Sequence, residues 1–279
     1  MIRRPPDTGP PGAWAGDGPG EGLVVLEQGM IGEVILETRG LRKEFRGFVA
    51  VDGIDLRVRR GSIHALIGPN GAGKTTVFNL LTRFLPATSG TIVYNGQDVT
   101  RLRPAAVARQ GLVRSFQISA VFPNLTVLEN VRVALQRRLG TSFHFWRSQR
   151  SLEVLDERAM ALLEAVDLAG QARTTTVELS YGRKRALELA TTLALEPELM
   201  LLDEPTQGMG REDVGRVVAL IRKLSAGRTV LMVEHNLSVV ADLSDTITVL
   251  ARGSVLAFGA YAEVSRDPAV LEAYVGTEP

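Results

Sequence analysis

The hydrophobic positions of this chain fall into short runs that predict β-strands. Leu199–Leu202 and Thr229–Val233 are almost wholly apolar, a pattern typical of parallel strands that are buried on both faces. Runs with strand character also cover Val34–Glu37, Val49–Val58 and Ile63–Ile67. We therefore expect a sheet-based core that begins near residue 33.

Helical patterns fill the intervals between these runs. The predicted helices, in chain order, are Lys74–Phe84, a helix from Thr126 toward Arg138, Ser151–Leu168, Tyr181–Leu195 and Arg211–Ser225. The start of the second helix is marked by a T-x-x-E capping box, Thr126 and Glu129. Strands and helices alternate on either side of a helical block over about residues 118–180, which predicts an α/β core with an inserted helical subdomain.

The first 32 residues differ in composition from the rest. They are rich in Gly and Pro and contain few large aliphatic side chains. Because burial cannot offset the entropy of ordering such a segment, we expect a disordered tail over 1–32, followed by one domain over 33–279. An alternative is that translation starts at Met30. Residues 139–150 resemble a surface insertion.

Composition excludes several classes of function. The formal net charge is +1, so no overall attraction to nucleic acid or to an anionic membrane is expected. The absence of cysteine excludes disulfides, thiolate metal sites and a cysteine nucleophile. No apolar run approaches the roughly 20 residues that span a bilayer, and no apolar stretch follows Arg3 and Arg4 to form an export signal. We therefore expect a protein inside the cell that reaches a membrane only through a partner.

A glycine-rich loop between a predicted strand and a predicted helix matches G-x-x-x-x-G-K-[ST] in full. In such a loop, backbone N–H groups surround phosphate oxygens, and the N-terminus of the following helix adds partial positive charge. Lys74 can reach the β- and γ-phosphates of a nucleotide, and the Thr75 hydroxyl can ligate Mg²⁺. The predicted phosphate-binding residues are Gly68, Pro69, Asn70, Gly71, Ala72, Gly73, Lys74, Thr75 and Thr76.

Two acidic residues end the apolar run Leu199–Leu202. Their position predicts that Asp203 and Glu204 lie at the carboxyl edge of the sheet, where open α/β folds bind ligands. Asp203 could hold Mg²⁺ there, and Glu204 could take a proton from an attacking water molecule. Taken alone, an Asp-Glu pair after a strand is more often a solvated turn, but the phosphate-binding loop upstream favours the catalytic interpretation.

Together with Leu179-Ser-Tyr-Gly182, these motifs resemble the ATPases of ABC transporters, over residues 33 to 276. The resemblance implies that Ser180 and Gly182, at the start of a helix, contact the ATP held by a second subunit. It also implies that Gln117 touches Mg²⁺ and the attacking water, and that His235 contacts the γ-phosphate. Phe45, or alternatively Phe48, stands where the family has an aromatic residue that stacks on adenine. The implied fold is an ABC-type P-loop core with an antiparallel β subdomain.

Further segments resemble the ATPases of branched-chain amino acid importers. They are Gly111–Gln117, Val121–Asn130 and Pro268–Gly276. The resemblance implies a peripheral protein at the cytoplasmic face of the membrane, with ATP and Mg²⁺ as cofactors. The implied partners are integral membrane subunits, a second ABC ATPase of the same or a different kind and, indirectly, a periplasmic or extracellular solute-binding protein.

The chain departs from the family pattern at two positions. Arg183 replaces the glutamine of the signature motif, and Gly210 stands where much of the family has Asp or Asn. Arg183 is followed by Lys184 and Arg185, a basic cluster that could hold the phosphates of the opposing nucleotide or could be a solvated helix face. Gly210 offers no side chain for the signalling between two ATP sites that the family pattern implies at this position, although Glu212 and Asp213 lie nearby.

Three other interpretations compete with the importer. The first is an ATPase subunit of an ABC exporter for lipid or lipopolysaccharide, whose motifs would look nearly the same. The second is an ABC ATPase of translation or DNA repair, although the chain has one P-loop and no sustained heptads. The third is a regulatory ATP-binding module without turnover, which would need no base at Glu204.

Apolar residues in the exposed segment around Gln117 to Glu129 predict a docking groove for a short helix of the membrane subunit. They are Phe116, Val121, Phe122 and Leu125. Apolar side chains on a soluble surface call for such an explanation. The alternative is that these side chains fold back into the helical block.

Overall fold

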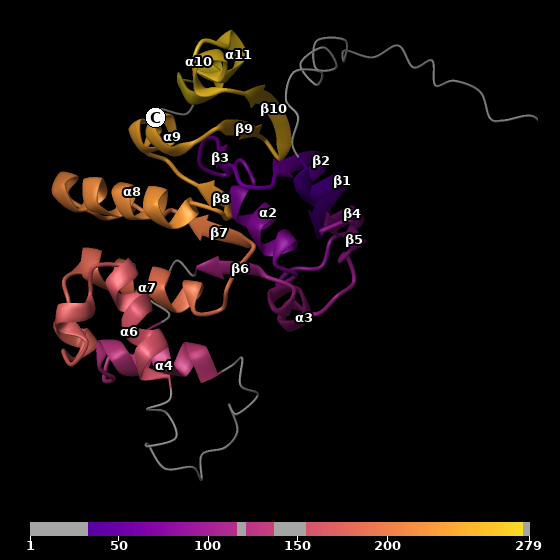
Figure 1. Cartoon of the computed structure of the whole chain (residues 1–279). Coiled ribbons are helices and arrows are strands. Elements are labelled where there is room, and N and C mark those ends of the chain that lie inside the picture. Colours follow the sequence, from indigo (N-terminus) through magenta and orange to yellow (C-terminus); the bar gives the residue numbers. More distant parts are fainter. Residues whose placement is uncertain (1–32, 116–120, 137–154, 276–279) are drawn as a thin grey trace, which may run out of the picture. The chain divides into compact units, whose positions relative to one another are not determined.

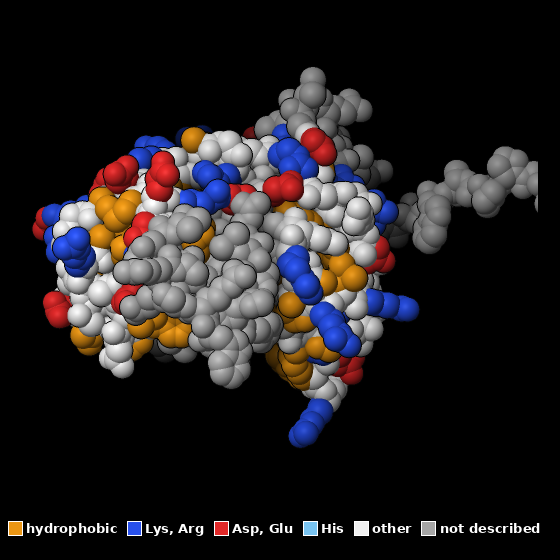
Figure 2. All heavy atoms as spheres, turned by 60° about the horizontal axis from the view of Figure 1, so that its bottom comes forward, with side chains coloured by type: hydrophobic (Ala, Val, Ile, Leu, Met, Phe, Trp, Pro, Cys, Tyr) orange, Lys and Arg blue, Asp and Glu red, His pale blue; other side chains and the backbone are white. Residues whose placement is uncertain are grey.

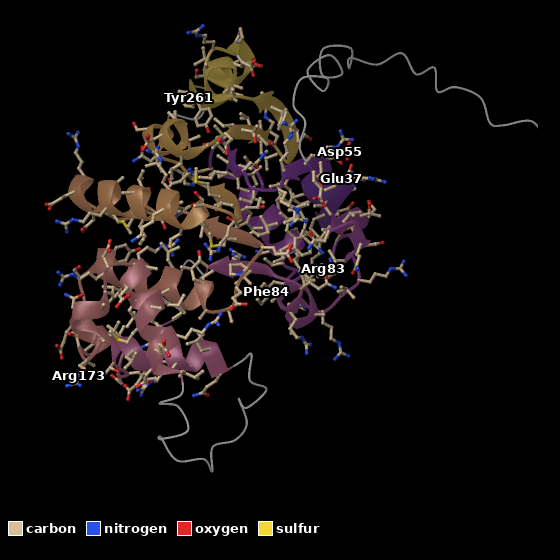
Figure 3. The ribbon with its side chains drawn as sticks, in the orientation of Figure 1. Glu37, Asp55, Arg83, Phe84, Arg173 and Tyr261 are labelled. Carbon is tan, nitrogen blue, oxygen red and sulfur yellow. The ribbon has the colours of Figure 1, made fainter. Side chains whose placement is uncertain are left out.

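Residues 33–115, 121–136 and 155–275 are described by a computed structural model, in which the strands form two sheets (Figure 1). The smaller sheet is antiparallel and has the order β2-β1-β4-β5. Its strands are β1 (Val34–Phe45), β2 (Phe48–Arg59), β4 (Ser89–Tyr94) and β5 (Gln97–Asp98). Side chains alternate along β2 between the core and the outer face, where Glu37 of β1 and Asp55 of β2 lie close together (Figure 3).

The larger sheet is mixed and has the order β10-β9-β3-β8-β7-β6. Its strands are β3 (Ile63–Ile67), β6 (Leu112–Ser115), β7 (Leu199–Asp203), β8 (Thr229–Val233), β9 (Thr246–Ala251) and β10 (Ser254–Gly259). Neighbouring strands from β9 to β6 pair in parallel, and β10 is antiparallel to β9. Parallel pairing brings the carboxyl ends of β3, β7 and β8 to one edge, which positions the candidate site.

The central strands β3, β7 and β8 are buried along their whole length and mostly apolar, because each face of the larger sheet is covered. Along β7, Leu199 and Leu201 enter a core shared with α2 (Lys74–Leu81) and the smaller sheet. Met200 and Leu202 enter the opposite core, which also contains side chains of α7 (Tyr181–Leu193), α8 (Arg211–Ser225) and α9 (Leu237–Leu243). The predicted burial of these strands on both faces is therefore confirmed.

Helices between β6 and β7 form a separate layer. Among the described residues they are α4 (Val127–Gln136), α6 (Asp156–Ala165), the 3-10 turns η2 (Ala169–Gln171) and η3 (Thr176–Glu178), and α7. Helix α4 packs against α6 and α7 (Figure 1). The predicted capping box is confirmed: the Thr126 amide donates to Glu129 Oε2 at 2.7 Å, and the Glu129 amide donates to Thr126 Oγ1 at 3.2 Å. The remaining helices are α3 (Pro104–Arg109), α10 (Tyr261–Val264) and α11 (Pro268–Val275).

Most predicted element bounds agree with the structure, and three differ. In the described residues, the helix predicted over Ser151–Leu168 covers only Asp156–Ala165, and Asp167 takes a left-handed φ of 59°. Strand β1 continues to Phe45 instead of ending near Glu37, because its pairing with β2 resumes beyond Gly40. At Gly40 the backbone takes a φ of 54° and the register shifts. Such an irregularity breaks the alternation that marks a strand in the sequence. Helix α2 ends at Leu81 instead of Phe84, because Arg83 takes a left-handed φ of 63°.

Four sequence interpretations fall outside the described residues: the tail over 1–32, the insertion over 139–150, Phe116 and Gln117. Within the described ranges, none of the helices combines the length and the hydrophobicity that crossing a membrane requires.

His64 of β3 gives a pH-dependent contribution to stability. Its ring is fully buried between the hydroxyls of Thr246 and Thr248, each 2.9 Å away, and burial lowers its pKa from 6.5 to about 4. A lowered pKa in the folded state means that protonation favours unfolding. This contribution is therefore complete above pH 6.5 and is lost as the pH falls toward 4, by roughly 1.4 kcal/mol per pH unit.

We expect His64→Gln to flatten the acid limb of the stability profile by about 3 kcal/mol between pH 6.5 and 4, relative to the wild-type chain. The measurement is urea unfolding at several pH values for both chains. Other titrating groups are common to the two proteins and cancel in the difference. Parallel profiles would show that His64 does not titrate on unfolding.

Candidate functional site

The loop 68–73 connects β3 to α2 and has a backbone shape that requires glycine at two positions. Gly68 has a φ of 147°, and a Cβ placed there would lie 2.1 Å from the Leu250 carbonyl oxygen. Gly73 has a φ of 101°, and its Cβ would lie 2.6 Å from the Ala50 carbonyl oxygen. The loop is therefore packed against neighbouring backbone, and its amides lead into the N-terminus of α2, as the phosphate-binding prediction requires.

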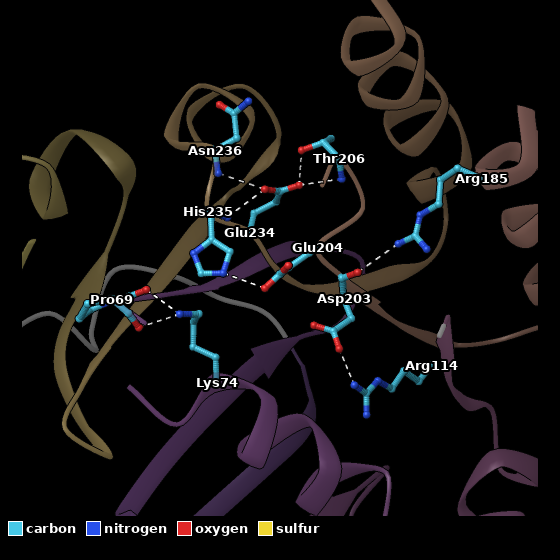
Figure 4. Close-up of polar contacts among 11 residues, drawn as sticks. Pro69, Lys74, Arg114, Arg185, Asp203, Glu204, Thr206, Glu234, His235 and Asn236 are labelled. Atoms are coloured by element: carbon cyan, nitrogen blue, oxygen red, sulfur yellow. Dashed lines mark hydrogen bonds and ion pairs between the residues drawn. The ribbon is translucent and has the colours of Figure 1, made fainter. Parts of the chain in front are cut away.

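The side chain of Lys74 folds back over this loop. Its ammonium donates to the carbonyl oxygens of Gly68 at 2.6 Å and of Pro69 at 2.9 Å (Figure 4). Lys74 is only 6% exposed, and burial lowers the pKa of its amine, while Glu204 and Asp203 act in the opposite direction. The ammonium thus lies between the loop and the acidic end of β7, where it can exchange two carbonyl partners for phosphate oxygens.

Asp203, the last residue of β7, is almost fully buried at the edge of the sheet. One carboxylate oxygen, Oδ2, pairs with Arg114 of β6, and the backbone carbonyl accepts from Arg185 of α7 at 3.2 Å. The other oxygen, Oδ1, is buried without a hydrogen-bond partner within the described ranges. A buried carboxylate oxygen with a free lone pair is suited to receive a cation.

Mg²⁺ fits this arrangement. It is commonly held in nucleotide sites by one or two protein oxygens together with phosphates and water, not by a cluster of carboxylates. In the described part of the chain, no group of three or more His, Cys, Asp or Glu side chains is arranged to hold a metal. Asp203 Oδ1 and the exposed Thr75 hydroxyl are the candidate ligands.

Glu204 and His235 face each other across the ends of β7 and β8. His235 Nε2 lies 2.7 Å from Glu204 Oε1 (Figure 4), and the Glu204 amide donates to the Val233 carbonyl at 2.9 Å. Glu204 has a φ of 46°, a left-handed conformation that is costly for a residue other than glycine. Strained backbone of this kind persists where neighbouring contacts enforce it, and it clusters at functional sites.

The signature residues lie at a second location. Ser180 is the N-cap residue of α7, is exposed and makes no side-chain capping bond, so its hydroxyl is available to a ligand. Gly182 lies close to Asp213 of α8, where an added Cβ would be 3.0 Å from the Asp213 carboxylate. Both line a hollow of about 400 Å³ between α7 and α8, and no residue of the loop 68–73 takes part in it.

The remaining predicted residues are placed as follows. Phe45 ends β1, is 42% exposed and has the Lys43 ammonium 5.0 Å from its ring centre, so its outer face can receive an adenine. Gly210 is the N-cap residue of α8. Arg183 faces the Gln171 amide, which can accept from its guanidinium when the amide oxygen is turned toward it.

The sequence interpretation missed three charged residues that support the site. Arg114 and Arg185 both hold Asp203, and Glu234 binds the loops that carry Glu204 and His235. Glu234 follows the apolar run Thr229–Val233, but an acidic residue after a strand is more often part of a solvated turn, so this position alone did not mark it. Arg114 had none, since its partner is remote in sequence. Arg185 belongs to the basic cluster after the signature motif, but it is neither on a solvated helix face nor open to a second nucleotide. It is 6% exposed and its guanidinium donates to Glu188 at 2.6 Å and to the Asp203 carbonyl.

Two family models match the chain. The model described as ABC transporter matches residues 51–207, and the model described as branched-chain amino acid ATP-binding cassette transporter matches residues 254–279.

Curated relatives match over most of their length. The high-affinity branched-chain amino acid transport ATP-binding protein BraF of Pseudomonas aeruginosa is 39% identical over 87% of this chain and 98% of its own. LivG of Escherichia coli, with the same description, is 38% identical over 87% of this chain and 98% of its own. The probable branched-chain amino acid transport ATP-binding protein LivG of Archaeoglobus fulgidus is 35% identical over 88% and 96% of the two chains.

Solved structures agree with the fold. A nucleotide-free ATP-binding cassette from an ABC transporter superposes with a TM-score of 0.77, at 29% identity over 87% of this chain and 99% of that one. An ATP-binding cassette in its ADP conformation gives the same TM-score at 30% identity, over 88% and 99% of the two chains. These likenesses confirm the predicted α/β architecture with its antiparallel β subdomain and inserted helices.

Proposed function

The chain belongs to the ATP-binding subunits of ABC transporters, which are ATPases, and from this membership we propose that it powers the import of branched-chain amino acids or related small solutes. The transported class is supported by the C-terminal match at residues 254–279 and by the identity to the BraF and LivG relatives. For hydrolysis, the observation that carries the proposal is the 2.7 Å contact between Glu204 and His235, beside Asp203 and the phosphate-binding loop.

In the proposed mechanism, the loop 68–73 and the amides at the start of α2 bind the phosphates of ATP. Lys74 exchanges the carbonyl oxygens of Gly68 and Pro69 for the β- and γ-phosphates. Thr75 and Asp203 hold Mg²⁺, which supplies charge neutralisation at the phosphates when bound. The ring of Phe45 stacks on adenine.

Glu204 acts as the general base toward the attacking water. The contact with His235 orients its carboxylate, and the imidazole is placed to hydrogen-bond the γ-phosphate once ATP is bound. Gln117 lies outside the described residues. Its proposed role is the one that the resemblance implies, contact with Mg²⁺ and with the attacking water.

We propose that the active form contains two ATP-binding subunits. Ser180 and Gly182 line a hollow that contains no residue of the chain's own loop 68–73. These two residues are therefore available to the ATP of a partner subunit. The partner is a second copy or a related ATPase. Membrane subunits, and through them a solute-binding protein, complete the transporter.

The proposed docking surface for the membrane subunit is a hollow between β6 and the helical layer. It has a volume of about 250 Å³, and its lining includes Val113, Phe122, Val133 and Thr191. Phe122 is 52% exposed, as the groove prediction requires, whereas Val121 packs partly against the helical core. Figure 2 shows the lower face of the molecule, where hydrophobic side chains reach the surface among charged ones.

Transport in vesicles tests the proposed function. With its membrane subunits and solute-binding protein, the chain should drive ATP-dependent uptake of radiolabelled leucine, and isoleucine and valine should compete. Phe122→Asp should reduce this uptake at least about tenfold, because a charge in an apolar contact is costly to bury. ATP binding by the isolated variant should stay unchanged.

Leu271→Asp is the matched control, since Leu271 is also 52% exposed but lies on α11. It should keep full uptake. Loss of folding in Phe122→Asp would instead place this side chain in the core. ATP hydrolysis by the wild-type transporter without uptake of any of the three amino acids would exclude the proposed substrate class.

A further inference from the structure

Glu234 is a buried carboxylate to which the mechanism above gives no task. It follows β8 and is 3% exposed, and its carboxylate accepts hydrogen bonds from the loop after β7 and from the loop after β8. Oε1 accepts from the Thr206 amide at 2.9 Å and from the Thr206 hydroxyl. Oε2 accepts from the amides of His235 at 2.9 Å and of Asn236 at 3.1 Å (Figure 4).

These donors belong to the two loops that carry the catalytic side chains. Thr206 lies two residues after Glu204 in the loop that follows β7, and His235 and Asn236 lead from β8 into α9. The same two loops are joined by the Glu204 amide on the Val233 carbonyl at 2.9 Å and by the contact between Glu204 and His235. Glu234 is thus the third connection between the two loops.

A carboxylate in this place is not explained by packing. Burying a charge is costly unless its lone pairs are filled, and an aliphatic side chain would fill the same space at no such cost. What the carboxylate adds is a pair of strong acceptors, one for each loop, and charge-assisted bonds of this kind fix geometry more firmly than neutral ones. Both oxygens are used, each toward a different loop.

We propose that Glu234 is a positioning residue for ATP hydrolysis: it fixes the loop after Glu204 and the loop of His235 as one unit, so that the base and the γ-phosphate contact keep their mutual position. The inference rests on the roles proposed for Glu204 and His235. We call these bonds of Glu234 to Thr206, His235 and Asn236 the clamp. Loosening the clamp should lower turnover without lowering ATP affinity, because none of these partners belongs to the loop 68–73.

The test uses the full chain with saturating MgATP. Glu234→Gln keeps the size of the side chain but replaces one acceptor oxygen by an NH₂ group, which cannot accept from the amides that point at it. We expect kcat to fall by about 10²-fold, the cost of a misplaced catalytic group, while the Kd for ATP stays within threefold. Thr206→Val removes only the hydroxyl donor and should lower kcat roughly tenfold, and Thr206→Ser should retain wild-type turnover.

A double-mutant cycle separates positioning from general destabilisation. If both residues act through one clamp, Thr206→Val should add little to the loss already caused by Glu234→Gln. Thr38→Val is the stability control, because Thr38 is a buried hydroxyl in β1 that bonds to the Ile54 carbonyl at 2.8 Å, outside the site. It should lower the melting temperature and leave kcat unchanged.

Three results would overturn the proposal: turnover within twofold of wild type in the folded Glu234 variant, additive losses in the cycle, or a fall in ATP affinity that matches the fall in kcat. Should Glu234→Gln not fold, the comparison of Thr206→Val with Thr206→Ser decides, since equal turnover in the two would exclude the clamp. Wild type and Glu204→Gln are assayed in parallel. Equal turnover in these two proteins would show that the proposed site is wrong. A normal loss in Glu204→Gln without a loss in Glu234→Gln would show that only the clamp is wrong.

Discussion

Glu204→Gln should lower the maximal rate of ATP hydrolysis by ~10²–10⁴-fold, the usual contribution of a general base. The amide cannot take a proton from water, but it has the size of the carboxylate and can still lie against His235. Nucleotide binding depends on the loop 68–73 and Lys74, so the affinity for ATP should change little. The measurement is steady-state phosphate release together with equilibrium binding of ATP.

Because ATP joins two subunits in the proposed active form, the Glu204 variant should also accumulate as an ATP-bound dimer in size-exclusion chromatography. Lys74→Ala provides the contrast: it removes the ammonium that is placed beside the loop and should weaken ATP binding itself. A rate within twofold of wild type in Glu204→Gln would remove this residue from the role of base.

The sequence predicted those parts of the site that depend on local pattern. The loop 68–73 is recognisable because its glycines and Lys74 follow each other directly, and Asp203 and Glu204 are recognisable because they end an apolar strand. Strands β7 and β8 and helix α8 were likewise predictable, because each is a continuous run with one period and clear limits. The capping box set the start of α4 for the same reason.

Contacts between residues remote in sequence could not be predicted in this way. Arg114 and Asp203 are 89 positions apart, and Glu234 and Thr206 are 28 apart. Both pairs meet because β6, β7 and β8 are neighbours in a parallel sheet, which no local periodicity reveals. The unexpected length of β1 has a similar origin, since pairing with β2 carries the strand past the irregularity at Gly40.

Arg114→Met should be among the most destabilising substitutions in the described part of the chain. The ion pair between Arg114 and Asp203 is buried, with side-chain exposures of 9% and 1%, and the same guanidinium donates to Asn79 at 2.6 Å. Removing one partner of such a pair leaves an uncompensated buried charge, which costs about 3–5 kcal/mol. The free energy of unfolding in urea, measured without nucleotide, gives this loss directly.

Arg216→Met is the matched control. The partner of Arg216, Glu212, is one turn away on the surface of α8, and the two side chains are 70% and 82% exposed. Losing this exposed ion pair should cost less than about 0.5 kcal/mol.

Mg²⁺ should then act differently on the wild-type and Arg114 chains. In the wild type, a cation that binds Asp203 meets the positive charge of Arg114 beside it, whereas in Arg114→Met it restores the charge balance that the substitution removed. Ligands that bind only the folded state raise the free energy of unfolding by RT ln(1 + L/Kd), where L is the free ligand concentration, so a tighter site gives a larger increment at the same concentration. Adding Mg²⁺ to the ATP-bound protein should therefore stabilise Arg114→Met by more than it stabilises the wild type, as measured by urea unfolding with ATP present and Mg²⁺ varied. Equal increments in the two chains would show that Mg²⁺ does not bind at Asp203, and a loss below 1 kcal/mol without nucleotide would show that the pair is not buried in solution.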